Sequence, residues 1–524
     1  PFGRSSFSVA GGLSTGLSYF LDGALHNNAV DGGYVTMPFP DALQEFKVET
    51  SASGAQGGVK SAGAVSLVTK SGTNQFHGNL FELVRNFKFN ARNALATRRD
   101  SIKRNQFGGT VGGPIIQNKL FFFAGYQGAL VRQDPLDTIT FVPTASMLTG
   151  DFTPVTSSAC NGGRQITLGA PFVGNRIDPA LFSKAAVLLA SKLPSTSDPC
   201  GRITFGNRSR ENDHQALGRI DYQKSANHSL FGRYLIESLV RPSSFSLNHN
   251  PLSINNGDDG LTQAFTVGST YLFGNNVVNS LRLTADRIAA GKFPPRDEIT
   301  AAGLTSTALG IKAYDYDPTA LRTTVTGGFA VGTQGGTTRT ALFGVNDDLS
   351  VLRGSHQLGF GASTSVSWVN NYAGQQTVNF SFNGQRTGLG LADFFMGYAR
   401  QFINGPNSAT LKTVKYLGLY SADTWKANRK LTVSYGLRWE PFFPMTNRDG
   451  VVSHFDADAM RKGIKSGQFN NTPPGMFFNG DPGFPGLPGM YVRWRNLSPR
   501  LGLAWDVAGD GRTSVRASAG TFYD

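Results

Sequence analysis

Short motifs that could perform chemistry are few in this sequence. The run Gly12-Leu13-Ser14-Thr15-Gly16 fits the G-x-S-x-G pattern of a serine nucleophile. That pattern needs an apolar strand before it and a helix after it, and neither surrounds this run, so we expect a glycine-rich strand or turn. The seven histidines include no H-x-x-x-H pair that would place two imidazoles on one helical face for a metal ion. We therefore expect no enzyme activity, no cofactor and no metal site.

Acidic pairs and cysteines leave open alternatives. Asp258-Asp259 and the pair Asp315 and Asp317 could offer oxygens to calcium, or could be solvated turn carboxylates. Cys160 and Cys200 share one stretch rich in Gly, Pro and Ser, without C-x-x-C spacing. A loop disulfide formed in an oxidising compartment and two unpaired thiols both fit, because sequence contains no Cα separation.

The composition favours an all-β protein. The 524 residues include 64 Gly, 39 Phe and 15 Tyr, with only 16% charged residues, a mixture typical of strands and tight turns. No apolar run reaches the roughly 18 residues that a spanning helix needs, but a spanning strand needs only about 10 residues with one apolar face. The net charge of +14 is scattered. Its densest cluster, Arg98, Arg99, Lys103 and Arg104, lacks interleaved aromatics, which indicates a solvated loop rather than nucleic-acid binding.

Strand-like runs alternate with connections of two kinds. Short turns with hairpin chemistry fall at 116–119, 225–228, 274–276, 353–356, 427–430 and 509–512. Long connections, such as 133–212 and 289–340, separate them. A soluble sandwich would also alternate apolar and polar residues, but short turns at one end and long loops at the other are typical of outer-membrane barrels. We expect about thirteen strands between Phe76 and Asp524.

Within the strands, apolar and polar residues alternate, as in Leu431 to Glu440, so one face suits lipid and the other a wet lumen. Aromatic residues near strand ends are predicted to form an interfacial girdle; they are Tyr416, Tyr420, Trp425, Trp439, Phe442 and Phe443. In the longest connection, Asp178-Pro179 predicts an N-capped helix that ends before Pro194.

The segment before Gly72 lacks the hairpin rhythm and is expected to be a separate small domain. No targeting signal follows Pro1, and a strand-like pattern runs to Asp524, so we expect both ends to be truncations.

Two sets of short motifs occur in order along the chain. The first set is Tyr19-Phe20-Leu21-Asp22-Gly23, Pro40 to Val48, and Gly63 to Asn74. The second set includes His77-Gly78, Asn105 to Gly109, Asp423-Thr424-Trp425, Tyr435 to Trp439, and Ser498 to Gly502. The first set resembles the plug domain, and the second the barrel, of the Oar-like group of TonB-dependent receptors. One departure is that Ala55-Gln56-Gly57 replaces the usual acidic residue after the alanine.

The resemblance implies a domain order and a function. Residues 1–72 would be the C-terminal part of a plug, and residues 73–524 the first part of a transmembrane antiparallel β-barrel with long extracellular loops. The protein would lie in a Gram-negative outer membrane, contact its lipid, and import an unidentified extracellular ligand when a periplasmic TonB complex pulls on the plug. The alternative is a structural or adhesive outer-membrane protein without cargo.

For the ligand-facing region we predict a plug segment that includes Tyr19, Asp22, His26, Asn27 and Asn28. Taken alone, His26 is expected to be a solvent-exposed loop histidine, because single histidines seldom form a site.

Overall fold

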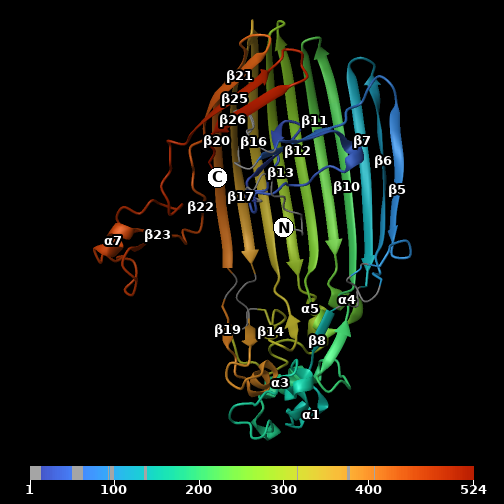
Figure 1. The fold of residues 1–524 in the computed structure, drawn as a ribbon, viewed down its shortest axis with the longest axis vertical. Helices are drawn as coiled ribbons and strands as arrows, with labels where there is room; N and C mark the ends of the chain where they lie inside the picture. The colour runs from blue at the N-terminus through green and yellow to red at the C-terminus, as the bar shows by residue number, and fades with distance from the viewer. Residues whose placement is uncertain are drawn as a thin grey trace.

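One large antiparallel sheet, here called the wall, dominates the computed structural model (Figure 1). The structure describes residues 13, 15–49, 63–92, 94, 99–134, 138–314, 317–373, 378–405 and 408–523. Within them, thirteen strands follow one another along the wall, and short β22 (Thr446–Asn447) pairs with β20 beside them. The thirteen are β5 (His77–Asn86), β6 (Lys103–Ile116), β7 (Leu120–Gln133), β10 (Ser209–Ser225), β11 (His228–Arg241), β12 (Gly257–Phe273), β13 (Val277–Phe293), β16 (Gly336–Arg353), β17 (His356–Ala373), β20 (Ser408–Lys426), β21 (Leu431–Trp439), β25 (Leu497–Asp506) and β26 (Ser514–Gly520).

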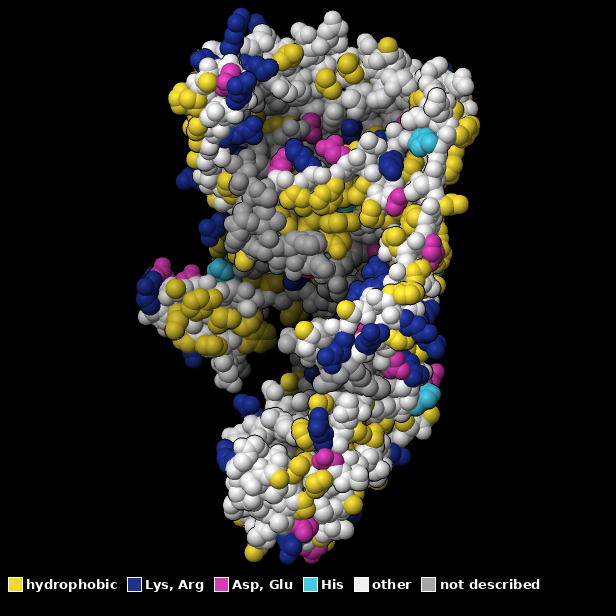
Figure 2. Space-filling view, turned by 45° about the vertical axis from the view of Figure 1, so that its right-hand side comes forward, with side chains coloured by type: hydrophobic (Ala, Val, Ile, Leu, Met, Phe, Trp, Pro, Cys, Tyr) yellow, Lys and Arg dark blue, Asp and Glu magenta, His cyan; other side chains and the backbone are white. Residues whose placement is uncertain are grey.

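The predicted alternation gives the wall two different faces. On β21, Tyr435 and Leu437 are each 47% exposed, whereas Arg438, the residue after Leu437, is 1% exposed. The same alternation recurs on neighbouring strands because the side chains of a strand point to opposite sides with a period of two. The apolar face is turned outward and the polar face lines a hollow, in which Figure 2 shows acidic and basic side chains. The all-β class is confirmed, and the expected count of about thirteen strands agrees with this large antiparallel sheet.

All six predicted short turns join consecutive strands of the wall at one end, called here the turn end. Asn118 (φ 60°), Gly274 (φ 62°) and Gly354 (φ 61°) adopt the positive φ that such tight turns require. The opposite, loop end carries the long connections. No helix among the described residues is long and apolar enough to cross a membrane.

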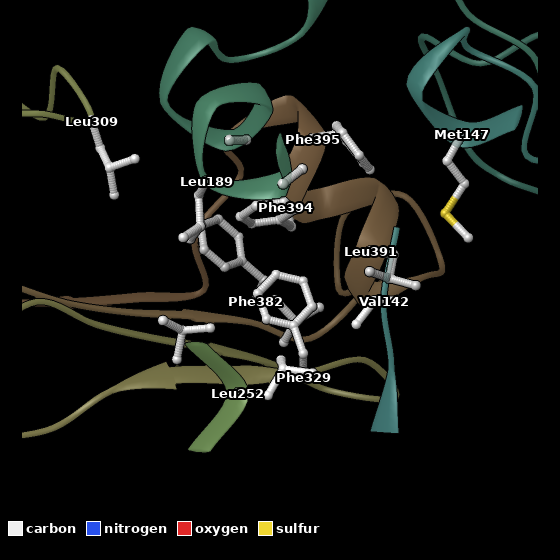
Figure 3. Close-up of a cluster of buried hydrophobic side chains, with 14 of the residues drawn as sticks. Val142, Met147, Leu189, Leu252, Leu309, Phe329, Phe382, Leu391, Phe394 and Phe395 are labelled. Carbon is white, nitrogen blue, oxygen red and sulfur yellow. The ribbon is translucent and has the colours of Figure 1, made fainter. Parts of the chain in front are cut away.

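The long connections at the loop end fold together into one lobe, which sequence analysis did not predict. Four connections, 134–208, 242–256, 294–335 and 374–407, contribute to a single apolar core, part of which is shown in Figure 3. Phe394 and Phe395 of α6 (Gly390–Met396) lie at its centre, and Phe395 packs against Phe152 and Phe182 with ring centroids 5.7 and 4.8 Å apart. The lobe's other elements are β8 (Thr138–Phe141), α1 (Ala145–Leu148), α2 (Thr153–Thr156), η2 (Ser158–Cys160), η3 (Pro179–Leu181), α3 (Lys184–Ser191), β9 (Arg202–Phe205), α4 (Ser244–Asn248), η4 (Pro251–Ser253), α5 (Arg296–Ala301), β14 (Arg322–Val325), β15 (Ala330–Gly332), β18 (Asn379–Phe382) and β19 (Gln401–Ile403).

The predicted helix after Asp178 is in fact two pieces. Asp178 Oδ1 does accept a hydrogen bond of 2.9 Å from the Ala180 amide, as an N-cap does, but the turn that follows is the short 3₁₀ helix η3. The chain then becomes extended at Phe182, whose side chain enters the lobe's core, and only afterwards forms α3. The helix is therefore interrupted at Phe182, because burial of its ring in the core requires an extended backbone there. In the same lobe Cys160 and Cys200 are joined by a disulfide, with Cα atoms 5.3 Å apart.

A second excursion leaves the wall between β21 and β25. The stretch 469–493 contains one short strand, β24 (Met476–Phe478), which pairs with β23 (Ser453–Phe455) beside α7 (Ala457–Arg461). Figure 2 shows many apolar side chains on the surface of this excursion, and Phe455, Met460 and Phe469 are each more than half exposed.

A small mixed sheet, called here the inner sheet, lies against the polar face of the wall. Its strands are β1 (Leu17–Leu21), β2 (Ala24–Leu25), β3 (Leu43–Glu49) and β4 (Gly63–Thr69), in the order β2-β1-β4-β3, with the 3₁₀ helix η1 (Pro40–Ala42) before β3. Its buried core continues into the wall through Phe123, Leu217, Leu235 and Ala264. Both polar and apolar contacts therefore hold it in the hollow.

Candidate functional site

The turn between β1 and β2 places one carboxylate deep in the interface with the wall. Asp22 (φ 53°) and Gly23 (φ 82°) adopt the left-handed conformation of a tight turn, which directs the Asp22 side chain toward the wall. Asp22 Oδ1 accepts a 2.8 Å hydrogen bond from the Thr69 amide and a 3.0 Å hydrogen bond from Arg219 Nη1. Arg233 Nε lies 3.0 Å from Oδ2. Two wall arginines therefore neutralise one carboxylate of the inner sheet.

A third arginine completes what we call the Asp22 cluster, formed by Asp22, Thr69, Arg219, Arg233 and Arg282. Arg282 Nε donates a 3.1 Å hydrogen bond to the backbone oxygen of Asp22. The Arg219 and Arg282 guanidinium groups both lie over the Phe231 ring, 4.5 and 5.1 Å from its centroid. Arg219 also pairs with Asp221 at 2.8 Å, so not all of its charge falls on Asp22. Removing one partner from such a buried group costs about 3–5 kcal/mol, because a charge is left uncompensated.

His26 is buried rather than exposed, so the interpretation as a loop histidine is wrong. It is 1% exposed, and its Nε2 lies 2.5 Å from the Thr36 carbonyl oxygen. Its Nδ1 lies 3.6 Å from Asp286 Oδ2 on β13. The short β1–β2 hairpin presses this residue against the wall, which no local pattern in the sequence indicated.

Asn27 and Tyr19 stabilise the inner sheet itself. Asn27 Oδ1 accepts a 2.9 Å hydrogen bond from the Tyr19 amide, and its Nδ2 donates to the Leu17 carbonyl oxygen at 2.9 Å. Tyr19 is 1% exposed and contacts Tyr34 edge to face, with ring centroids 5.5 Å apart. Burial, reinforced by the neighbouring Tyr34 and Asp31, raises the pKa of the Tyr19 phenol. Asn28, by contrast, is only partly buried.

Two cavities lie between the inner sheet and the wall. The loop-side cavity, of about 330 Å³, includes Asn27 and Asn28 in its lining together with wall residues such as Ser365, Tyr416 and Glu440. The turn-side cavity, of about 420 Å³, is lined by Gly23 and by wall residues that include Arg282, Asp348 and Tyr420. The predicted segment Tyr19 to Asn28 therefore touches both cavities, at Gly23 on one side and at Asn27 and Asn28 on the other.

Lumen-facing side chains on or next to β16, β20 and β21 form two hydrogen-bonded groups, one beside each cavity. Arg438 Nε donates to Glu440 Oε1 at 2.8 Å, and the Tyr416 hydroxyl donates to the same oxygen at 2.5 Å. The Tyr420 hydroxyl donates to Asp348 Oδ1 at 2.5 Å.

Sequence analysis missed these groups. The prediction that Tyr416 and Tyr420 belong to an interfacial girdle is wrong, because both share the lumen face of β20 with Gly418. The odd-numbered Trp425 faces outward and is 38% exposed. Strict application of the two-residue period along β20 would have separated the two tyrosines from Trp425.

One member of each acidic pair singled out in the sequence forms an ion pair with an arginine in the structure. Asp258 pairs with Arg241 at 2.8 Å and Asp317 with Arg296 at 2.6 Å, which explains both carboxylates without calcium. Asp315 lies outside the described residues, as do Gly12 and Ser14 of the serine pattern, Ala55-Gln56-Gly57 and Arg98. Within the described ranges no group of three or more His, Cys, Asp or Glu side chains is arranged to hold a metal ion.

Comparison with known proteins agrees with this architecture. The family described as "Outer membrane beta barrel domain" matches residues 68–524. The TonB-dependent transporter Oar of Myxococcus xanthus is 28% identical over 141 residues, which is 25% of this chain and 13% of that protein. The expected resemblance to the Oar-like group is thereby confirmed.

A solved structure shares the fold. The outer membrane transporter YddB from Escherichia coli superposes with a TM-score of 0.53 and 11% identity, over 98% of this chain and 54% of its own. The chain thus spans about half the length of that transporter and a smaller share of Oar. At this identity the likeness is one of fold.

Proposed function

The chain belongs to the outer membrane β-barrel domain family, and from that premise we propose that it forms the plug and barrel wall of a TonB-dependent transporter. Residues 1–72, which include the inner sheet, would be plug, and residues 73–524 barrel. The lobe at the loop end would face the outside of the cell and the turn end the periplasm. The cargo would be a ligand taken up from outside.

The observation that carries this proposal is the Asp22 cluster, in which a plug carboxylate is neutralised by wall arginines. Moving the plug would separate Asp22 from Arg219 and Arg233 and leave buried charges uncompensated, at about 3–5 kcal/mol. Because each 1.4 kcal/mol is a factor of ten, spontaneous opening would be rarer by about 10²-fold or more. Apolar contacts of the plug with Phe123 and Leu217 add to this cost. A plug held in this way stays closed until an external force acts on it, which is the task of an energy-transducing partner.

The first test is calorimetric titration of the detergent-purified full-length protein with the periplasmic domain of its host's TonB. We expect saturable binding that disappears when the N-terminal segment of the full-length protein is deleted. Absence of binding by a protein whose barrel is folded would contradict the proposal, and so would ligand uptake that persists after the membrane is de-energised.

A second candidate function, adhesion or a structural role, draws on the lobe. Four connections that are distant in sequence build a continuous apolar core there, with a disulfide in the same lobe. A rigid platform of this kind suits surface attachment as well as ligand capture. Deletion of the lobe would abolish attachment but leave TonB binding intact if adhesion were its role.

A further inference from the structure

The two cavities lie along the same strip of wall, formed by β16, β17 and β20. In the plug, Gly23 lines the turn-side cavity and Leu25 lines the loop-side cavity. β2 (Ala24–Leu25), which contains Leu25 and follows Gly23 directly, contacts β13 and β16. Gly23 and β2 of the plug therefore separate the two cavities, and the same wall strands line both cavities.

This strip is lined by small side chains where other parts of the wall fill the gap to the plug. On β17, alternate residues facing the lumen are glycines or serines; they are Gly359, Gly361, Ser363, Ser365 and Ser367. On β10 the corresponding lumen face carries Gln215 and Arg219, which hydrogen-bond the plug directly. Among the described strands, the two cavities between plug and wall therefore lie beside β17 rather than beside β10.

One large side chain lies between the cavities, and a glycine holds it against the wall. A Cβ atom at Gly361 would lie 2.2 Å from Tyr420 Cε1, so the ring occupies the place of that missing side chain. At Gly359, two residues away, a Cβ atom would lie 3.7 Å from Tyr420 Cε2, an ordinary contact. The hydrogen bond from the Tyr420 hydroxyl to Asp348 fixes the other end of the side chain. Tyr420 therefore lies flat on β17 instead of projecting toward the plug.

We propose that solutes pass the plug along the β16–β17–β20 strip, from the loop-side to the turn-side cavity, and that Tyr420 is the positioning residue that sets the width of this passage. The inference rests on the proposed transport function and deepens it.

The charges along the strip indicate the class of solute. Arg282 and Asp348 line the turn-side cavity, and Lys415 and Glu440 line the loop-side one. Because positive and negative groups are balanced, the strip favours neutral or zwitterionic polar molecules over strongly anionic ones. Cavities of about 330 and 420 Å³ fall in the range of small-molecule sites.

Thiol labelling of the full-length protein in cells tests the path without knowledge of the ligand. Because Cys160 and Cys200 form a disulfide, a single introduced cysteine is the reactive thiol among the described residues. Ser363→Cys places it between the cavities, and Gln127→Cys, on the lumen face of β7, is the matched control. With a hydrophilic zwitterionic methanethiosulfonate as the probe, we expect energised cells to label Ser363→Cys about tenfold faster than Gln127→Cys. Equal or faster labelling at Gln127→Cys would overturn the path.

The two glycines test the role of Tyr420. In the Ser363→Cys background, Gly361→Ala should slow labelling about fivefold or more, because Tyr420 must swing toward the plug, while Gly359→Ala should leave the rate unchanged. If Gly361→Ala fails to fold, Tyr420→Ala serves instead and should speed labelling. Equal rates in all of these variants would eliminate Tyr420 as the determinant of width.

Failure of this inference differs from failure of the proposed function. If the path is wrong but the protein transports, labelling will still depend on energy and will appear at Gln127→Cys instead. If the protein does not transport, neither position will respond to energy, although the barrel is folded, and both proposals fall. A strongly anionic thiosulfonate that labels Ser363→Cys faster than the zwitterionic one would overturn the solute class alone.

Discussion

The carboxylate of Asp22 lies 3.0 Å from the guanidinium Nε of Arg233, and their side chains are 2% and 0% exposed. The two residues are more than two hundred positions apart, one in the inner sheet and one in the barrel wall. This pair is almost fully removed from water. It stabilises the position of the inner sheet chiefly because burying either charge without its partner would cost several kcal/mol. The inner sheet is therefore held against the wall by a charged contact that would leave both groups uncompensated if the sheet moved away.

Asp22→Asn is expected to loosen the inner sheet from the wall. The substitution keeps the shape of the side chain but removes the carboxylate that pairs with Arg219 and Arg233, leaving Arg233 with only Asp286 as a neighbouring negative charge. We expect a loss of about 3–5 kcal/mol. Limited proteolysis of residues 15–49 in urea should then begin at lower denaturant, with the barrel intact. Asp31→Asn, at an exposed turn of the same domain, is the control and should behave like the wild type. Identical protease profiles for Asp22→Asn and the wild type would show that the pair contributes nothing.

Phe395→Ala should unfold the loop-end lobe. Phe395 is fully buried among Phe152, Phe182 and Phe394, and the cavity left by a buried phenylalanine costs about 3–5 kcal/mol. Hydrogen exchange should increase together in α3 and β14, since both belong to the same core. Val173→Ala, at a side chain that is 82% exposed, should have no such effect. Faster exchange in α6 alone would mean that the four connections do not form a single cooperative unit.

Replacing both cysteines, Cys160→Ser with Cys200→Ser, should destabilise the same lobe. The bond closes a loop of 40 residues, for which the loop-entropy model gives about 4 kcal/mol. The expected result is a lower melting temperature of the lobe, measured by exchange or by a fluorescent probe at position 181, with unchanged strand content by circular dichroism. An unaltered melting temperature would show that the lobe's apolar core suffices without the bond.

Acid should weaken the first turns of the lobe through Asp151. Hydrogen bonds from the hydroxyl and amide of Thr153, with a smaller contribution from Arg176, hold the pKa of Asp151 below its usual range. A depressed folded-state pKa stabilises the fold above the unfolded value of about 3.9. That contribution is lost as the pH falls through the lower, folded-state pKa. Asp151→Asn should therefore speed exchange of α2 at pH 7 but match the wild type at strongly acidic pH. If exchange of α2 in Asp151→Asn and in the wild type still differs at strongly acidic pH, the effect comes from the shape of the side chain rather than from its charge.

Local patterns determined most of the wall. A strand exposes its side chains with a period of two, and a tight turn needs residues that tolerate positive φ, so both features can be recognised within a few neighbouring residues. For this reason the thirteen strands, the six short turns and the two faces of strands such as Leu431–Trp439 were predictable. The motifs around Asp22 and Gly72 also sufficed to recognise the family, because those residues lie close together in sequence.

The tertiary structure decided which distant residues meet. Nothing local to Asp22 indicates Arg219 or Arg233, because their approach depends on the register of β10 and β11 and on how the inner sheet docks. His26 is buried by the wall rather than by its neighbours, and Phe182 interrupts a helix because a core that its connection shares with three others accepts its ring. By itself the sequence therefore determined the strands, their faces and the family. The ionic contact between the inner sheet and the wall, the folded lobe and the cavities beside Tyr420 arise only when segments hundreds of residues apart exclude water from a shared surface.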